Sequence, residues 1–180
     1  SNLRAKGHDV FTVELTKQLI AKDILVLSAG CTCGGLENTG LMSPAAAELA
    51  GGGLREVCQS LGIPPVLNFG PCLAIGRMDL LCGEIAAELG VDFPQLPVVL
   101  SAPQWLEEQA LADGAFALSL GFTLHLGLPP FVTGSPVIHD ALANQMKDIT
   151  GGQLIVDTDI TSSADRLEAV ILEKRAGLGL

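Results

Sequence analysis

The stretch ILVLSAGCTCGG, residues 24–35, decides how the rest of the chain is interpreted. Its first part, residues 24–29, is a leucine-rich, β-branched run without charges, which is typical of a parallel strand buried on both faces. Cys31, Cys33 and paired glycines follow at once. In α/β proteins, ligand-binding loops lie where such strands end. The stretch therefore predicts an α/β fold with a candidate site in the turn that follows the strand.

Similar apolar runs recur along the chain, and segments with helical periodicity separate them. We expect strands at residues 24–29, 66–70, 97–103, 122–127 and 153–158, and helices at residues 12–21, 43–61, 77–89, 104–120, 135–149 and 162–176. The glycine run at residues 51–53 weakens or splits the second of these helices. This alternation predicts a single Rossmann-like domain over residues 1–180, a three-layer αβα fold with a mostly parallel sheet of about five or more strands.

The composition excludes some functions and favours others. The formal net charge is −10 and only 17% of residues are charged, so nucleic-acid binding, which needs clustered Lys and Arg, is excluded. No apolar run reaches the ~20 residues of a membrane-spanning helix. An odd number of cysteines, five, with no secretory signal indicates a reducing, cytoplasmic setting. With so few charges, we expect part of the surface to be buried against other domains or subunits.

The segment GCTCGG, residues 30–35, matches the common local motifs poorly. It lacks the spacing of a phosphate loop, a dithiol redox pair would have two residues between its cysteines, and a zinc site lacks a second close pair. Cys72 follows the second expected strand, so the fold brings it to the sheet edge that holds Cys31. Several converging thiolates are what a metal cluster needs. Spacing alone leaves two interpretations open: Cys31 and Cys72 are co-ligands, or both are small turn residues.

Three further residues have simpler interpretations. Cys58 and Cys82 lie on helical apolar periods, where a thiol packs as a small hydrophobic group. His125 lies within an apolar strand, which favours a core histidine whose hydrogen bonds are satisfied.

Seven segments together are more specific than any single motif. In order they are DILVLSAGC, GLMSPAAAELAGGGLREVCQSLGIPPVLNFGPC, ELGVDFPQLPVV, SAPQWLEEQA, HLGLPPFVTGSP, GGQLIVDTD and LEKRAGLGL. With this set, the chain from Gly7 to Leu180 resembles the C-terminal domain of the anaerobic nickel–iron–sulfur carbon monoxide dehydrogenase catalytic subunit, within the prismane/hybrid cluster protein superfamily.

The resemblance implies a cytoplasmic, homodimeric, multidomain oxidoreductase that converts CO and water to CO2 and passes two electrons to a carrier such as ferredoxin. It implies a Ni–Fe–S cluster held by Cys31, in SAGC, and Cys72, in GPC. Cys33, two residues after Cys31, differs from the family pattern and is an additional candidate metal ligand. A further family cysteine would fall at Ser1-Asn2. The remaining domains of the polypeptide would supply the other ligands and the [4Fe-4S] clusters. The isolated domain is therefore expected to hold no cofactor and to be inactive.

Two departures from the family pattern bear on activity. Gln109 stands where the family has an active-site lysine, and it is the one candidate here for a catalytic position. Glutamine donates hydrogen bonds but neither titrates nor carries positive charge. Asn68 stands in place of the family histidine before the second cysteine turn. Two alternatives therefore stay open: a domain that binds a metal cluster without oxidising CO, and a structural or dimerisation domain.

Overall fold

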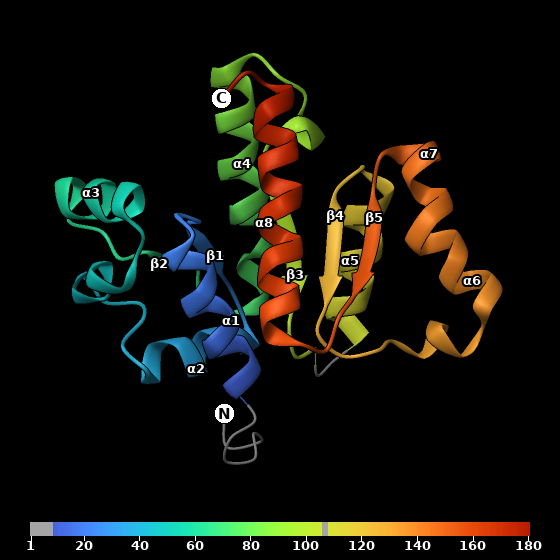
Figure 1. Cartoon of the computed structure of the whole chain (residues 1–180), viewed down its shortest axis with the longest axis horizontal. Coiled ribbons are helices and arrows are strands. Elements are labelled where there is room, and N and C mark those ends of the chain that lie inside the picture. The colour runs from blue at the N-terminus through green and yellow to red at the C-terminus, as the bar shows by residue number, and fades with distance from the viewer. Residues whose placement is uncertain (1–8, 106–107) are drawn as a thin grey trace. The chain divides into compact units, whose positions relative to one another are not determined.

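The computed structural model describes residues 9–105 and 108–180. Contacts within the chain divide it into two compact units, Ser1–Ile85 and Ala86–Leu180. Each unit has its own parallel sheet. The elements of both are labelled in Figure 1.

The first unit contains two short parallel strands and the helices around them. In chain order its elements are α1 (Val10–Ala21), β1 (Val26–Ser28), α2 (Cys31–Asn38), the 3-10 helix η1 (Pro44–Leu49), α3 (Gly52–Leu61), β2 (Val66–Asn68), the 3-10 turn η2 (Cys72–Ala74) and the start of α4 (Ile75–Leu89). The strands pair in parallel, with Val26 opposite Val66 and Ser28 opposite Asn68.

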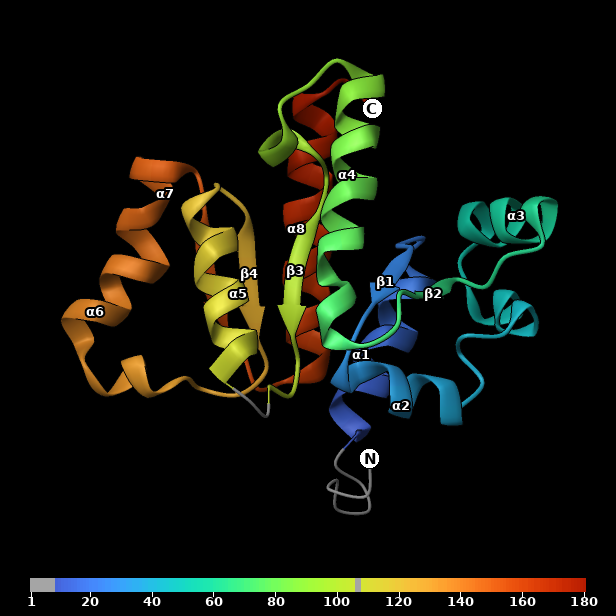
Figure 2. The same ribbon diagram turned by 180° about the vertical axis from the view of Figure 1, so that it is seen from behind.

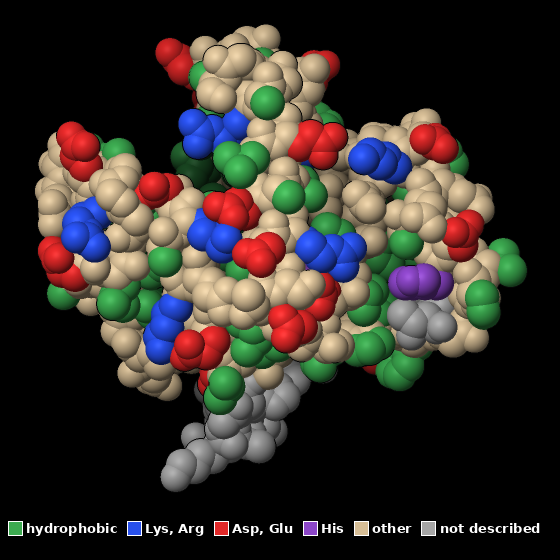
Figure 3. Space-filling model, viewed as in Figure 1, with side chains coloured by type: hydrophobic (Ala, Val, Ile, Leu, Met, Phe, Trp, Pro, Cys, Tyr) green, Lys and Arg blue, Asp and Glu red, His purple; other side chains and the backbone are tan. Residues whose placement is uncertain are grey.

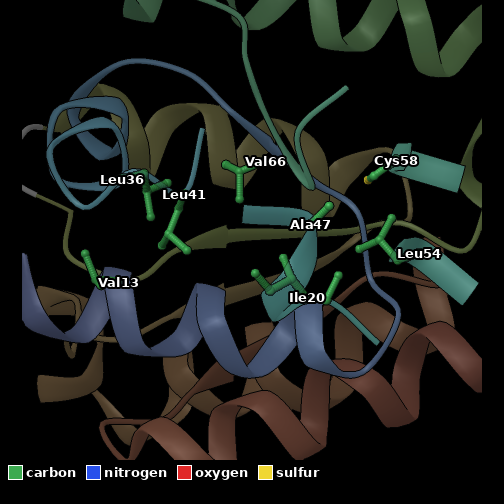
Figure 4. Close-up of a cluster of buried hydrophobic side chains, with 9 residues drawn as sticks. Val13, Ile20, Leu36, Leu41, Ala47, Leu54, Cys58 and Val66 are labelled. Atoms are coloured by element: carbon green, nitrogen blue, oxygen red, sulfur yellow. The ribbon is translucent and has the colours of Figure 1, made fainter. Parts of the chain in front are cut away.

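The core of the first unit joins its helices to β2. Side chains from α1, α2, α3 and β2 meet there, and Figure 4 shows them converging on one another; they include Val13, Ile20, Leu36, Leu41, Leu54 and Val66. Cys58, with 1% of its surface exposed, packs in the same cluster. Burial raises the pKa of its thiol. The interpretation of Cys58 as a core residue is confirmed, and Cys82 is also buried.

The glycine run splits the helix expected at residues 43–61, as predicted. The first part is η1, and α3 begins at Gly52. Asp23, in the left-handed region at φ 63°, reaches across from the end of α1. Its Oδ1 accepts a hydrogen bond from the backbone N–H of Leu54 at 2.8 Å. A Cβ on Gly51 would overlap the Asp23 carboxylate. The glycine is therefore required by the close approach of a cap from a distant loop.

The second unit is a small three-layer αβα arrangement. Its elements are the 3-10 turn η3 (Phe93–Gln95), β3 (Val99–Ala102), α5 (Glu108–Ser119), β4 (Thr123–Leu126), the 3-10 turn η4 (Phe131–Gly134), α6 (Pro136–Asp140), the π-helical turn η5 (Ala141–Gln145), α7 (Met146–Thr150), β5 (Gln153–Val156) and α8 (Ile160–Gly177). The strands pair in parallel in the order β3-β4-β5. Helices α5 and α8 both contact the sheet, and Figures 1 and 2 show them on opposite faces.

The α/β class and the parallel pairing are confirmed, with one difference in the sheet. All five expected strands form, each of three or four residues. They are divided into a sheet of two strands and a sheet of three, where one sheet of about five or more strands was expected. The apolar runs predict where strands form, and only the packing of the helices decides which strands are neighbours.

The largest error concerns the segment after β1, which the sequence indicated as a turn. Residues Cys31–Asn38 form α2 instead. Its paired glycines lower its intrinsic helix propensity. Burial offsets this cost, because Leu36 enters the core and Gly35 lies so near Asp9 that a Cβ would come within 2.7 Å of the Asp9 Cγ. Tertiary contact, which no local pattern reports, stabilises this helix.

The described surface carries many apolar side chains. Large ones that are more than half exposed include Leu73, Leu80, Phe131, Val137 and Ile149. Figure 3 shows hydrophobic side chains spread over the face in view, among scattered acidic ones. Among the described residues, no helix has the length and apolarity to cross a bilayer.

Candidate metal centre

The carboxyl ends of β1 and β2 lie side by side, because the two strands are parallel and in register. The backbone beyond them is joined by two further hydrogen bonds. The N–H of Phe69 donates to the carbonyl of Ser28 at 2.9 Å, and the N–H of Gly30 donates to the carbonyl of Gly70 at 2.8 Å. The two loops that leave the sheet are thereby held against one another.

Each loop turns at a glycine in the left-handed region just before a cysteine. Gly30 has φ 70° and is the N-cap of α2, so Cys31 begins that helix. Gly70 has φ 97°, and Pro71 then leads into Cys72 at the start of η2. Residues other than glycine adopt this backbone region only with strain. The sequence signal for both turns was the glycine that precedes each candidate ligand.

The structure brings the thiols of Cys31 and Cys72 together. Cys31 is exposed and Cys72 is partly buried, and neither is in a disulfide. Burial, followed by the charge of Cys31 and a side-chain hydrogen bond with it, raises the pKa of Cys72. Cys72 also packs directly on Gly30, where a Cβ would lie 2.5 Å from its Sγ. Two thiolates this close would repel one another, so the free pair disfavours ionisation of both thiols. A cation bound between them would favour the ionised form instead.

The third candidate, Cys33, lies in a different environment. It is 8% exposed, and its Sγ lies 3.5 Å from Ser28 Oγ and 3.4 Å from Asn68 Oδ1. Its thiol is therefore engaged inside the unit, between the ends of the two strands. Its sequence position, next but one to Cys31, gave no sign of this difference.

Two thiols do not form a complete site. Within residues 9–105 and 108–180, no group of three or more His, Cys, Asp or Glu is arranged to hold a metal ion. Ser1-Asn2, where the resemblance would put a further family cysteine, lies outside the described residues. Two cysteines with soft sulfur donors fit part of the ligand set of an iron–sulfur or nickel-containing cluster.

Gln109 belongs to the second unit. It is exposed in the first turn of α5, which begins at Glu108. The helix was expected from residue 104, whereas residues 103–104 form a turn after β3, which ends at Ala102. An amide at this position binds by hydrogen bonding and does not exchange a proton.

His125 is a core residue, as its apolar surroundings indicated. It is fully buried on β4, and its Nδ1 lies 2.8 Å from Ser101 Oγ and its Nε2 3.0 Å from Ser163 Oγ. The Ser163 hydroxyl donates to the Asp157 carbonyl, so its oxygen accepts from Nε2–H. Burial lowers the pKa of His125 to about 4. The ring is therefore neutral and both of its nitrogens are hydrogen-bonded.

Comparison with known proteins adds a second, independent line of argument. A model of the Prismane/CO dehydrogenase family matches residues 1–161. The carbon monoxide dehydrogenase of Methanocaldococcus jannaschii is 55% identical over 180 residues, which are 100% of this chain and 29% of that protein.

Two solved structures share the fold. An as-isolated, Ni-free carbon monoxide dehydrogenase from Thermococcus sp. AM4 gives a TM-score of 0.91 at 40% identity, over 95% of this chain and 27% of that one. The closed and open alpha subunits of an acetyl-CoA synthase/carbon monoxide dehydrogenase with NiZn[Fe4S4] and NiNi[Fe4S4] clusters give a TM-score of 0.90 at 31% identity, over 95% of this chain and 27% of that one. The chain thus spans less than a third of the length of these relatives.

Proposed function

We propose, from the premise that the chain belongs to the Prismane/CO dehydrogenase family, that it is the C-terminal domain of a carbon monoxide dehydrogenase and supplies Cys31 and Cys72 to a Ni–Fe–S cluster. The observation that carries this proposal is the meeting of these two thiols at the adjoining ends of β1 and β2. They come from two separate loops, so their juxtaposition is a property of the fold.

The residues present fit one side of such a cluster. Sulfur is the donor that iron–sulfur and nickel sites take. Cys31 is exposed, so its thiol is accessible to ligands supplied by other segments. When bound, the cluster supplies a site for CO and accepts the two electrons released as CO and water become CO2. Cys72, held on Gly30, and Cys31, at the start of α2, fix two of the attachment points.

Gln109 provides an amide where the resemblance puts a lysine, so proton transfer at that position falls to another group. Arg77 is exposed and, with Pro71, Leu73 and Ala74, lines a small pocket of about 120 Å³ beside Cys72. Its guanidinium carries a fixed positive charge.

The proposal extends to the whole protein. Residues 1–180 act as one domain, and the remaining domains of the same polypeptide supply the other ligands and the [4Fe-4S] clusters. A second copy completes a homodimer, and a carrier such as ferredoxin receives the electrons. The many exposed apolar side chains support contact with such domains. The location is the cytoplasm, where free thiols remain reduced.

Metal analysis of the full-length protein tests this proposal. We expect Cys31→Ala and Cys72→Ala each to remove nearly all nickel and to lower the iron content, because a cluster loses an attachment point. Cys58→Ala is the matched control, since it makes the same change at a buried cysteine of the same unit. Nickel and iron at wild-type levels in both ligand variants would contradict the proposal.

A further inference from the structure

The third candidate ligand, Cys33, lies at the centre of a hydrogen-bond network that joins both ligand-bearing loops. Cys33 is buried in the first turn of α2. Its thiol donates to Asn68 Oδ1 at 3.4 Å and has the Gly70 carbonyl at 3.8 Å as a second acceptor. Asn68 ends β2 and Gly70 lies in the loop that follows it, so the contact crosses from one loop to the other.

Asn68 continues the network toward Cys72. The oxygen of its side-chain amide also accepts the backbone N–H of Gly70 at 2.8 Å. This bond holds the chain in the left-handed turn that leads through Pro71 to Cys72. A single amide oxygen therefore accepts hydrogen bonds from Cys33 of one loop and from Gly70 of the other.

Ser28 and Thr32 anchor the other side of the network. The hydroxyl of Ser28, at the end of β1, lies 2.7 Å from Thr32 Oγ1 and 3.5 Å from Cys33 Sγ. Thr32 Oγ1 also donates to the carbonyl of Ala29 at 3.1 Å. These bonds fix the first turn of α2, and with it Cys31, on the end of β1.

We propose that Cys33, acting through Asn68, is a positioning residue that sets the separation and orientation of the Cys31 and Cys72 thiols, rather than a third metal ligand. The claim that this positioning matters for the cluster rests on the proposed function. The claim that Cys33 positions the two thiols does not, because it concerns only the geometry of the thiol pair. A buried thiol that donates inward is poorly placed to reach a cluster, while the bond that it makes crosses between the two loops that carry the ligands.

A reagent that needs both thiols at once measures this arrangement directly. Phenylarsine oxide reacts with two adjacent thiols: two As–S bonds form, the arsenic–oxygen bond and the two S–H bonds break, the oxygen leaves as water with the two thiol protons, and no electrons are transferred. The experiment uses metal-free, reduced full-length protein and follows, by peptide mass, the adduct that bridges Cys31 and Cys72. Iodoacetamide measures the reactivity of each thiol alone.

Two substitutions of Cys33 distinguish the effect of its hydrogen bond from the effect of its sulfur atom. We expect Cys33→Ala to slow capture of the pair about threefold, the scale of one weak hydrogen bond, without changing single-thiol alkylation. Cys33→Ser keeps a donor and should restore the wild-type rate. Cys58→Ala should also match wild type, because Cys58 lies in the core among apolar side chains. Wild-type capture by Cys33→Ala, or equal slowing in Cys33→Ser, would overturn the proposal.

A second pair keeps the test decisive if Cys33→Ala does not fold. Asn68→Asp retains an acceptor for Cys33 and Gly70, and Asn68→Ala removes it, so only the alanine variant should slow capture. Equal capture by these two variants contradicts the role of Asn68.

Nickel and iron content of the holoprotein distinguishes positioning from ligation. A positioning residue predicts wild-type metal in Cys33→Ser, whereas a ligand predicts loss in Cys33→Ser and Cys33→Ala alike. If Cys31→Ala and Cys72→Ala keep their metal, the proposed function fails, and the arsenical experiment on metal-free protein still decides the role of Cys33.

Discussion

The two sheets of this protein are associated with polar side chains in opposite environments. At the end of β1 and β2, Cys31 and Cys72 face one another and Cys31 is exposed. In the β3-β4-β5 sheet, His125 is fully buried and each ring nitrogen has a serine partner. The cysteines follow two parallel strands and the histidine lies within one, and both places carry residue types that bind metals.

The difference shows that a metal-binding residue type in or beside a parallel sheet does not by itself identify a site. A histidine whose two nitrogens are occupied has no lone pair to offer without losing a hydrogen bond. The thiols of Cys31 and Cys72 interact with one another, and a cation bound between them would offset the repulsion between their ionised forms. A thiol pair whose proximity disfavours two free thiolates is a better candidate for a metal centre than a histidine whose two ring nitrogens are hydrogen-bonded.

The substitution with the largest expected effect on this comparison between the buried histidine and the thiol pair is His125→Ala. Losing a buried ring and its two hydrogen bonds should destabilise the second unit by about 4 kcal/mol. Amide hydrogen exchange of β4 and β5 in the full-length protein measures this loss. Ser101→Ala, which removes one partner, is the milder control at about 1 kcal/mol. Metal loss from His125→Ala with exchange protection intact would break the comparison, because it would place His125 in the metal centre.

Acidification should weaken the second unit for the same reason. His125 has a pKa of about 4 in the folded state against 6.5 when unfolded. The unfolded state therefore binds more protons between these values, and stability present above pH 6.5 falls as the pH drops toward 4. The full loss is about 3 kcal/mol.

Exchange protection of β4, measured across this pH range, follows the effect. Asp157 and Arg166, the charged groups near the ring, act in opposite directions on its pKa. His125→Gln has no ionisable group at this position. A curve for this variant as steep as that of wild type would assign the pH dependence to another group.

At the other strand end, Gly30→Ala should disturb the thiol pair. The new Cβ would lie 2.5 Å from Cys72 Sγ, at a backbone φ of 70°. We expect a loss of about 2 kcal/mol of stability in the first unit, together with reduced nickel content. Hydrogen exchange of β1 and β2 and metal analysis measure the two effects.

Gly34→Ala is the matched control for this prediction. Gly34 belongs to the same helix and has open space around its Cβ position. Alanine there should be neutral or slightly stabilising, by up to about 1 kcal/mol. Equal damage from both substitutions would show that α2 tolerates no side chain, rather than that the thiol site needs Gly30.

The smallest expected effect concerns Gln109, the one candidate for chemistry in the second unit. Gln109→Lys supplies a titrating, positively charged group where glutamine has none. We expect CO oxidation by the full-length protein to rise about tenfold and its pH profile to change. Gln109→Leu, without charge, should show no gain. An unchanged rate in Gln109→Lys would show that the position does not act on the reaction.

Much of the fold could be predicted from local patterns. All five strands lie within the expected segments, because each is a short apolar run bounded by turn residues. The split of the long helix at residues 51–53 followed from its glycines. The division into two sheets and helix α2 could not be predicted in this way. Both depend on contacts between distant segments, such as Leu36 in the core and Asp9 against Gly35.

By itself, the sequence determined the strand ends, the family likeness and the choice of Cys31 and Cys72 as candidate ligands. These depend on local apolar runs and on ordered motifs, which are properties of the chain read in one dimension. Only the tertiary structure decided that these thiols meet, that Cys33 turns inward to Asn68, and that His125 is satisfied. Each of these facts depends on which hydrogen-bonding partners the fold places beside a polar atom, and those partners come from distant parts of the chain.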